Sequence, residues 1–130
     1  MKNSNLDIRH GSASQKRGAK GEGRAVLYLL LRGYRILERN YLYGRKEVDI
    51  IAKKGDTIAF IEVKARYAND LAPRLAVTAS KRRNIVSAAK AYAAQNGIHN
   101  AYLRFDIIEV DLQKRLPLAG VTHIPGAFTE

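Results

Sequence analysis

The stretch from Glu47 to Arg66, EVDIIAKKGDTIAFIEVKAR, constrains the fold more than any other part of the sequence. Two runs rich in β-branched and aromatic residues, Val48 to Ala52 and Thr57 to Val63, flank a short turn that contains Gly55. Such runs on either side of a short glycine-containing turn are typical of a β-hairpin. The sequence therefore predicts two antiparallel strands here.

Both predicted strands carry charged side chains among the apolar ones. Because side chains two residues apart point to the same face of a strand, Glu47 shares a face with Asp49, and Glu62 shares a face with Lys64. If the two faces coincide, two or three carboxylates and a lysine meet. Crowded carboxylates repel one another unless a cation or a proton lies between them, and carboxylate oxygens suit Mg²⁺ or Mn²⁺.

The balance of charge favours an anionic partner. The chain has 130 residues, enough for one domain with a core, and its 23 Lys and Arg against 12 Asp and Glu give a net charge of +11. A surplus of this size favours nucleic acid as the partner, with an anionic membrane surface as the second choice.

The composition also excludes several kinds of site. The chain has no cysteine and three histidines, which excludes disulfides and thiolate metal sites and leaves no zinc constellation. The longest apolar run, Ala25 to Leu31, is too short to span a membrane, and the first residues lack the apolar stretch of a signal peptide. We therefore expect a cytoplasmic protein without a membrane segment.

The first helix is expected after a polar tail. Residues 1–17 are polar and basic and are expected to be a disordered tail, so that residues 18–130 form the single folded domain. From Gly18 to Gly33 apolar residues recur at helical spacing, and Glu22 stands at the start of this apolar face. Glu22 either complements the helix dipole from the first turn or adds a third carboxylate to Asp49 and Glu62.

A strand and a loop flank the hairpin. The run from Tyr34 to Tyr43 alternates as a strand does, and the basic turn after it, with Arg45 and Lys46, leads into the hairpin. This pattern predicts three antiparallel strands after one helix. Residues 67–77 contain Asn, Asp and Pro and are predicted to be a loop that could close over a substrate.

A second helix is predicted from Thr78 or Ser80 to the Asn96-Gly97 pair. The cations of its first turn are Lys81, Arg82 and Arg83. The unpaired N–H groups of a helix N-terminus attract phosphate, and three cations add to that attraction. The alternative is a solvated basic face without a ligand.

The rest of the pattern completes a sheet. Ala101 to Leu112 is predicted to be a strand that enters the sheet after a helical crossover, with Arg104 and Asp106 on its polar face. Val121 to Ile124 is the candidate for a short edge strand. The order of helix, three strands, helix and strand predicts an α/β fold in which helices pack on a mixed sheet.

Asp49 and the Glu62-Val63-Lys64 triplet, preceded by a helix that carries an acid, form a motif. It resembles the catalytic signature of the PD-(D/E)xK nuclease superfamily, without the proline before the aspartate. More of the chain resembles the YraN-like family of uncharacterised bacterial proteins, thought similar to archaeal Holliday junction resolvases. The matching stretches are GAKGEGRAVLYLLLRGYRILERNY, EVDIIAKKGDTIAFIEVKAR, AVTASKRRNIVSAAKAYAAQNG and LRFDIIEVD. The resemblance implies a restriction-endonuclease-like fold.

The same resemblance implies roles for individual residues. Glu22, Asp49 and Glu62 would be ligands of Mg²⁺ or Mn²⁺, and Asp49, Glu62 and Lys64 would be catalytic. The cations expected to contact nucleic acid beside them are Arg45, Lys46, Lys81, Arg82 and Arg83. The implied activity is that of an endonuclease on DNA. The likeness to junction resolvases, which act as dimers, suggests branched DNA and a homodimer.

Three other interpretations compete with a nuclease. The first is a nucleic-acid-binding module that has the nuclease fold but does not cleave. The second, a membrane-surface protein, lacks support because neither predicted helix combines a basic face with a bulky apolar one. The third makes Glu62 and Lys64 a surface ion pair on an edge strand, which leaves Asp49 and Glu22 unexplained.

Overall fold

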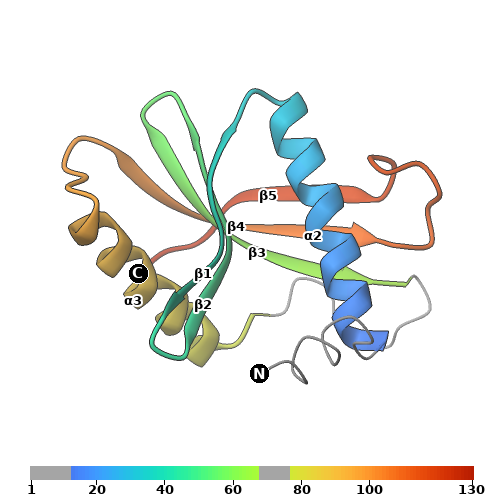
Figure 1. The fold of residues 1–130 in the computed structure, drawn as a ribbon, viewed down its shortest axis with the longest axis horizontal. Coiled ribbons are helices and arrows are strands. Elements are labelled where there is room, and N and C mark those ends of the chain that lie inside the picture. The colour runs from blue at the N-terminus through green and yellow to red at the C-terminus, as the bar shows by residue number, and fades with distance from the viewer. Residues whose placement is uncertain (1–12, 68–76) are drawn as a thin grey trace, which may run out of the picture.

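The structure is a computed structural model that describes residues 13–67 and 77–130. In these residues, two helices pack on a mixed five-stranded sheet. The elements are α2 (Ala13–Leu31), β1 (Arg35–Tyr43), β2 (Lys46–Lys54), β3 (Thr57–Arg66), α3 (Ala79–Gln95), β4 (Tyr102–Asp111) and β5 (Val121–Phe128). The strands lie side by side in chain order; β3 and β4 are parallel, and all other neighbours are antiparallel. This order confirms the α/β fold and is consistent with a nuclease-like arrangement (Figure 1).

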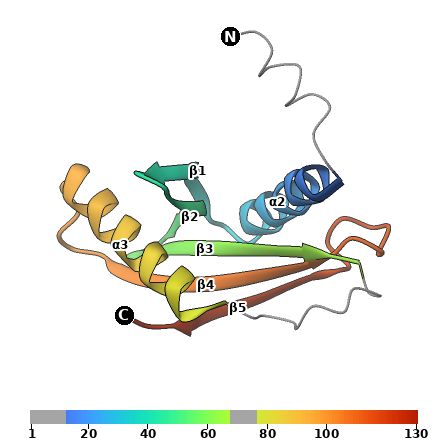
Figure 2. The same ribbon diagram turned by 90° about the horizontal axis from the view of Figure 1, so that it is seen from below.

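The two helices cover opposite faces of the sheet. Phe60 of β3 packs in one buried cluster with Ile85 of α3, and its neighbour Ile61 packs in another with Leu29 of α2. Neighbouring residues of a strand point to opposite faces, so α2 and α3 lie on different sides. In both ribbon views the β1–β2 hairpin lies between the two helices (Figures 1 and 2). Neither of these described helices is long and apolar enough to cross a membrane.

The first helix extends beyond the predicted boundary. It begins at Ala13 rather than at Gly18, and it ends at Leu31, just before Gly33 with its φ of +91°. The first turn of α2 contains no acid, so Glu22 lies in the middle of the helix. The interpretation of Glu22 as a partner of the helix dipole is therefore wrong. Residues 1–12 of the expected tail lie outside the described residues.

The second helix follows the prediction closely. The side chain of Thr78 accepts a hydrogen bond of 3.1 Å from the N–H of Lys81, which is the expected N-cap, and α3 ends before Asn96. Residues 68–76, most of the predicted loop, lie outside the described residues. The last strand runs on to Phe128 and includes Pro125, which a strand tolerates at the edge of a sheet.

A buried polar network joins β4 to β5, at the residues Arg104 and Asp106 that alternate with apolar residues along β4. Asp106 is fully buried; its carboxylate accepts hydrogen bonds from Arg104 at 2.8 and 2.9 Å and from the N–H of Gly126 at 3.0 Å, and lies 2.8 Å from His123 Nε2. Burial alone would raise the pKa of Asp106, but the bonds from His123, Arg104 and Gly126 outweigh it and lower the pKa. The network stabilises the strand pair because the buried charge is fully hydrogen-bonded.

Helix α2 approaches β3 closely at Gly21. A Cβ atom placed on the buried Gly21 would overlap the Cβ atom of Ala65, so the two backbones can come this near only at a glycine. The next residue is Glu22, so the close contact at Gly21 also places Glu22 near the sheet. Close packing at one glycine therefore sets the position of a predicted site residue.

The variants Gly21→Ala and Gly23→Ala form a matched pair. Gly21→Ala should lower the free energy of unfolding by about 1–3 kcal/mol, because the added methyl group must push α2 away from β3. At Gly23 no described atom lies within 4 Å of an added Cβ. Gly23→Ala should therefore raise the free energy of unfolding by about 0.5–1 kcal/mol through helix propensity. Urea unfolding measures both, and two shifts of the same sign would contradict the packing argument.

Candidate active site

The β2–β3 ladder stops just short of the predicted acids. Its last pair is Ile50 with Ile61, so Asp49 and Glu62 follow without a backbone pair between them. Val48 packs on the α3 side and Ile50 on the α2 side, which breaks the side-chain alternation of β2 at Asp49. Figure 2 shows the β1–β2 hairpin turning away from β3, β4 and β5. The separating strands leave space for a site.

A cavity of about 540 Å³ lies where the strands separate. Its walls come from α2, β1, β2 and β3, namely Gly18, Ala19, Glu22, Asn40, Glu47, Asp49 and Val63. Three carboxylates, those of Glu22, Glu47 and Asp49, thus face one cavity. The fold brings together acids that lie on separate elements of the sequence.

Asp49 is held at the end of the ladder by a backbone group. Its Oδ2 atom accepts a hydrogen bond of 2.8 Å from the N–H of Val63. Burial and the negative charge of Glu62 raise the pKa of Asp49 to about 7, against the lowering effect of the Val63 bond. Glu47 adds to the rise and Lys81 opposes it. The raised pKa therefore reflects burial first and the crowding of two carboxylates second.

Glu62 is buried on a central strand, with two lysines nearby. Lys64 Nζ lies 3.8 Å from its Oε2 atom and Lys81 Nζ lies 3.7 Å from its Oε1 atom, both too far for a hydrogen bond. In the described part of the chain, Oε1 has no hydrogen-bond partner. Burial raises the pKa of Glu62, although Lys81 and Lys64 oppose the rise. Because β3 is the third of five strands, the interpretation as a surface pair on an edge strand is wrong.

Glu22 lines the cavity and forms an ion pair with Arg39. Its Oε2 atom accepts hydrogen bonds from Arg39 Nε at 2.9 Å and from Asn40 Nδ2 at 3.1 Å. The Glu22 side chain is 12% exposed. The third predicted acid is therefore at the site, but its charge is already paired within the protein.

Asn40 and Arg39 belong to the site although the sequence pattern does not point to them. Asn40 is the one non-glycine residue with a positive φ, +53°, among those described. In the β1–β2 register it falls opposite Asp49. Asparagine adopts this left-handed conformation more readily than most residues and is depleted in strands. An asparagine inside a predicted strand was the one signal that could have shown the irregularity.

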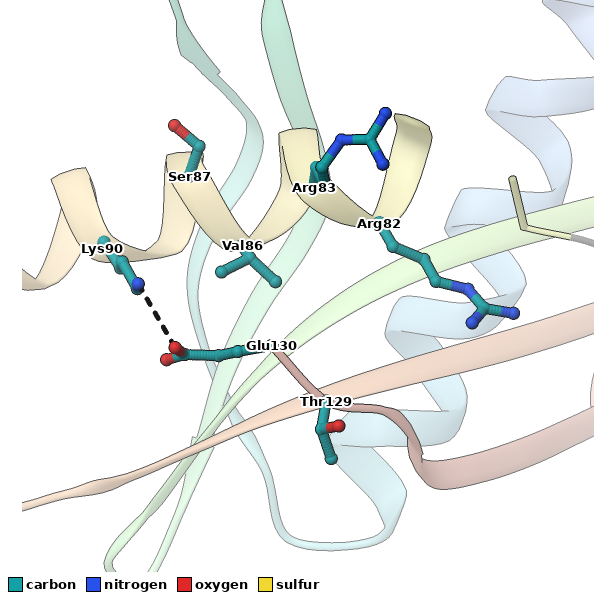
Figure 3. Close-up of a pocket in the computed structure, with 7 residues that line it drawn as sticks. All are labelled: Arg82, Arg83, Val86, Ser87, Lys90, Thr129 and Glu130. Carbon is teal, nitrogen blue, oxygen red and sulfur yellow. Dashed lines mark ion pairs between the residues drawn. The ribbon is translucent and has the colours of Figure 1, made fainter. Parts of the chain in front are cut away.

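The cations predicted at the start of α3 do not form one cluster. Lys81 faces Glu62, as its 3.7 Å ion pair shows. Arg82 instead donates from Nε to the carbonyl of Val77 at 3.1 Å. Figure 3 shows the guanidinium groups of Arg82 and Arg83 pointing in different directions. Arg83 is exposed.

The two cations of the hairpin turn also differ from each other. Lys46 donates from Nζ to the hydroxyl of Ser87 at 3.0 Å and so connects the turn to α3, whereas Arg45 is exposed. A second cavity of about 480 Å³ lies between α3 and the residues after β5 (Figure 3). Its cations are Arg82, Arg83 and Lys90, and Lys90 pairs with Glu130 at 3.2 Å. It has no pair of crowded acids.

The donor set suits a hard divalent cation. Within residues 13–67 and 77–130, no group of three or more acidic or histidine side chains is arranged so that it could hold a metal ion. Asp49 and Glu62 nevertheless offer crowded carboxylates, one of them with a buried oxygen that has no hydrogen bond. Mg²⁺ is commonly bound by one or two carboxylates, with water and phosphate in the other positions, so this pair fits it. Lys64 lies beside the pair.

Comparisons with known proteins find relatives along most of the chain. A model of the family described as "Uncharacterised protein family UPF0102" matches residues 21–110. A UPF0102 protein from Chlorobium phaeobacteroides is 43% identical over 116 residues, covering 85% of this chain and 91% of the relative. One from Geobacter metallireducens is 43% identical over 112 residues, covering 85% and 90%, and one from Clostridioides difficile is 40% identical over 116 residues, covering 88% and 98%.

The variant Asp49→Asn tests the electrostatics of the metal-free site. Between the usual pKa of 3.8 and the folded pKa of about 7, the folded wild type holds a proton that the unfolded chain has released. The stability of the wild type should therefore fall, relative to that of the variant, as pH rises from about 4 to about 7. At pH 8 Asp49→Asn should have the larger free energy of unfolding, by about 1–3 kcal/mol.

Urea unfolding over this pH range without divalent ions measures the difference. Asp56→Asn, which changes an exposed acid in the β2–β3 turn, serves as the control and should stay within about 0.5 kcal/mol of wild type. A difference between Asp49→Asn and wild type that does not change with pH would contradict the raised pKa.

Proposed function

Because the chain belongs to the uncharacterised protein family UPF0102, which confirms the resemblance found in its sequence, we propose its activity from the site itself. The protein is a metal-dependent endonuclease that hydrolyses phosphodiester bonds of DNA. One observation carries this proposal: the buried Oε1 atom of Glu62 has no hydrogen bond among the described residues, next to an Asp49 whose pKa is raised to about 7. Such a pair needs a cation.

The residues of the pair have roles that the chemistry of phosphodiester hydrolysis explains. Asp49 and Glu62 would hold Mg²⁺ or Mn²⁺, and such an ion would supply polarisation of the scissile phosphate and a lowered pKa of water. Lys64, with 38% of its side chain exposed, is near enough to place a positive charge where negative charge builds on the phosphate. Lys81 pairs with Glu62 from the other side and positions it.

The surrounding charge supports nucleic acid as the substrate. The net charge is +11, Arg45 is exposed in the β1–β2 turn, and Arg83 is exposed on α3. Contacts from such residues to phosphate carry no sequence information, so the shape of the DNA is the expected determinant. Branched or junction DNA, a homodimer with two sites and a cytoplasmic location belong to the same proposal, by analogy with the resolvases that the sequence resembles.

One observation favours a second candidate, a nucleic-acid-binding module that does not cleave. The described residues contain no group of three metal-binding side chains, and Lys64 and Lys81 both lie within 4 Å of Glu62. In such a module the two lysines balance the charge of Glu62 in place of a metal ion. The first candidate cleaves DNA and requires Lys64 to do so, whereas the second binds nucleic acid without cleaving it.

Cleavage of labelled DNA decides between the two candidates. Linear, flapped and four-way-junction substrates are incubated with Mg²⁺ or Mn²⁺ and with wild type, Lys64→Ala or Lys54→Ala, purified identically. Wild type and Lys54→Ala should cut the branched substrates, and Lys64→Ala should be slower by about 100-fold or more, because a charge beside the phosphate is lost. Lys54→Ala removes the same charge from an exposed position away from the cavity.

The pattern across the three proteins identifies the source of any activity. A contaminating nuclease would cut equally in all three preparations. Binding of every substrate without a cut by any of them would establish the non-cleaving module and refute the enzyme.

The exposed Arg45 and Arg83 should contribute to the salt dependence of binding. Arg45→Ala combined with Arg83→Ala should weaken duplex binding and reduce the slope of log K against log salt by about 2, because each contact with phosphate contributes about 0.9. Arg35→Ala combined with Lys53→Ala removes two cations from the other end of the β1–β2 hairpin and should leave the slope nearly unchanged. Equal slopes for the two double variants, measured by fluorescence anisotropy with Ca²⁺, would remove Arg45 and Arg83 from the binding surface.

A further inference from the structure

The acids of the site are balanced to very different degrees. Glu22 accepts a hydrogen bond from the Arg39 guanidinium at 2.9 Å and one from Asn40 at 3.1 Å, both on the same oxygen. Glu62 has only lysine nitrogens at 3.7 and 3.8 Å. The need for a cation is therefore greatest at Asp49 and Glu62 and is already met at Glu22.

The backbone of β1 is shaped to make this pairing. Asn40 has a φ of +53° and falls opposite Asp49, at a place where a regular strand would present extended backbone. In this irregular conformation, Arg39 and Asn40 donate hydrogen bonds to the carboxylate of Glu22, which lies on the preceding helix α2. A residue held in a sparsely populated backbone region commonly marks a functional constraint.

From these contacts we infer that the site takes one divalent ion and that Arg39 occupies the role of a second cation. The ion is held by Asp49 and Glu62 and not by Glu22. Asn40 donates the second hydrogen bond to the same Glu22 oxygen and so helps to position the Glu22 carboxylate at the cavity. The inference rests on the proposed function, since it requires a metal ion at Asp49 and Glu62.

Counting bound Mn²⁺ on the full chain tests this inference without any measurement of activity. Isothermal titration calorimetry at pH 8 gives the number of ions for wild type and for Glu22→Gln, Asp49→Asn, Arg39→Gln and Arg39→Lys. Wild type should bind one ion. Glu22→Gln should also bind one ion with an affinity within about threefold of wild type, because Glu22 is not a ligand and its charge is already balanced by Arg39. Asp49→Asn should bind none.

The two arginine variants form a matched pair that tests the role of Arg39. Arg39→Gln leaves Glu22 beside Glu47 and Asp49 without a cation, so a second, weaker ion should bind. Arg39→Lys keeps the charge and should still bind one ion. A single ion on Arg39→Gln would overturn the role given to Arg39.

The remaining outcomes separate this inference from the proposed function. Two ions on wild type with one on Glu22→Gln, or loss of all binding in Glu22→Gln, would overturn the inference and leave the nuclease proposal intact. No ion on wild type, or undiminished binding in Asp49→Asn, would remove the metal centre and both proposals with it.

Discussion

The early end of the β2–β3 ladder is the constraint on which the site depends. After the pair of Ile50 with Ile61, the N–H of Val63 donates its hydrogen bond to the carboxylate of Asp49 instead of to a strand carbonyl. One side chain thus replaces a backbone partner, and the β1–β2 hairpin can turn away from the rest of the sheet (Figure 2). A backbone donor keeps a hydrogen bond, and Asp49 faces a cavity instead of a packed strand.

The acids Asp106, Glu22 and the pair of Asp49 and Glu62 differ in how completely their charges are balanced by neighbouring groups. Asp106 is completely satisfied by Arg104, His123 and a backbone N–H, which makes it part of the framework. Glu22 is satisfied by two side chains of β1. Asp49 and Glu62 are left crowded and incompletely paired, with raised pKa values. Because a protein usually satisfies its buried charges, the unsatisfied pair is the part of the molecule that points to function.

Several features of the sequence were sufficient for the fold and for much of the site. The hairpin around Gly55 and the helix after Thr78 were predictable because turn glycines, caps and periodic apolar residues act over a few positions. Asp49 and Glu62 were predictable as neighbours because each comes directly after the last residue pair of the hairpin, Ile50 with Ile61. The burial of Asp106 was not predictable, since alternation cannot foresee an arginine and a histidine that pair with a buried carboxylate.

Local pattern thus settles which residues are strand, helix, turn and acid, because those properties depend on near neighbours. It leaves open which cation faces which acid. Arg39 meets Glu22 because the backbone irregularity at Asn40 turns β1 and because Gly21 lets α2 approach β3. Lys81 faces Glu62 while Arg82 bonds to a backbone carbonyl, a distinction made by the packing of α3 on the sheet. These pairings join residues far apart in the chain, so they exist only once the sheet and both helices are assembled.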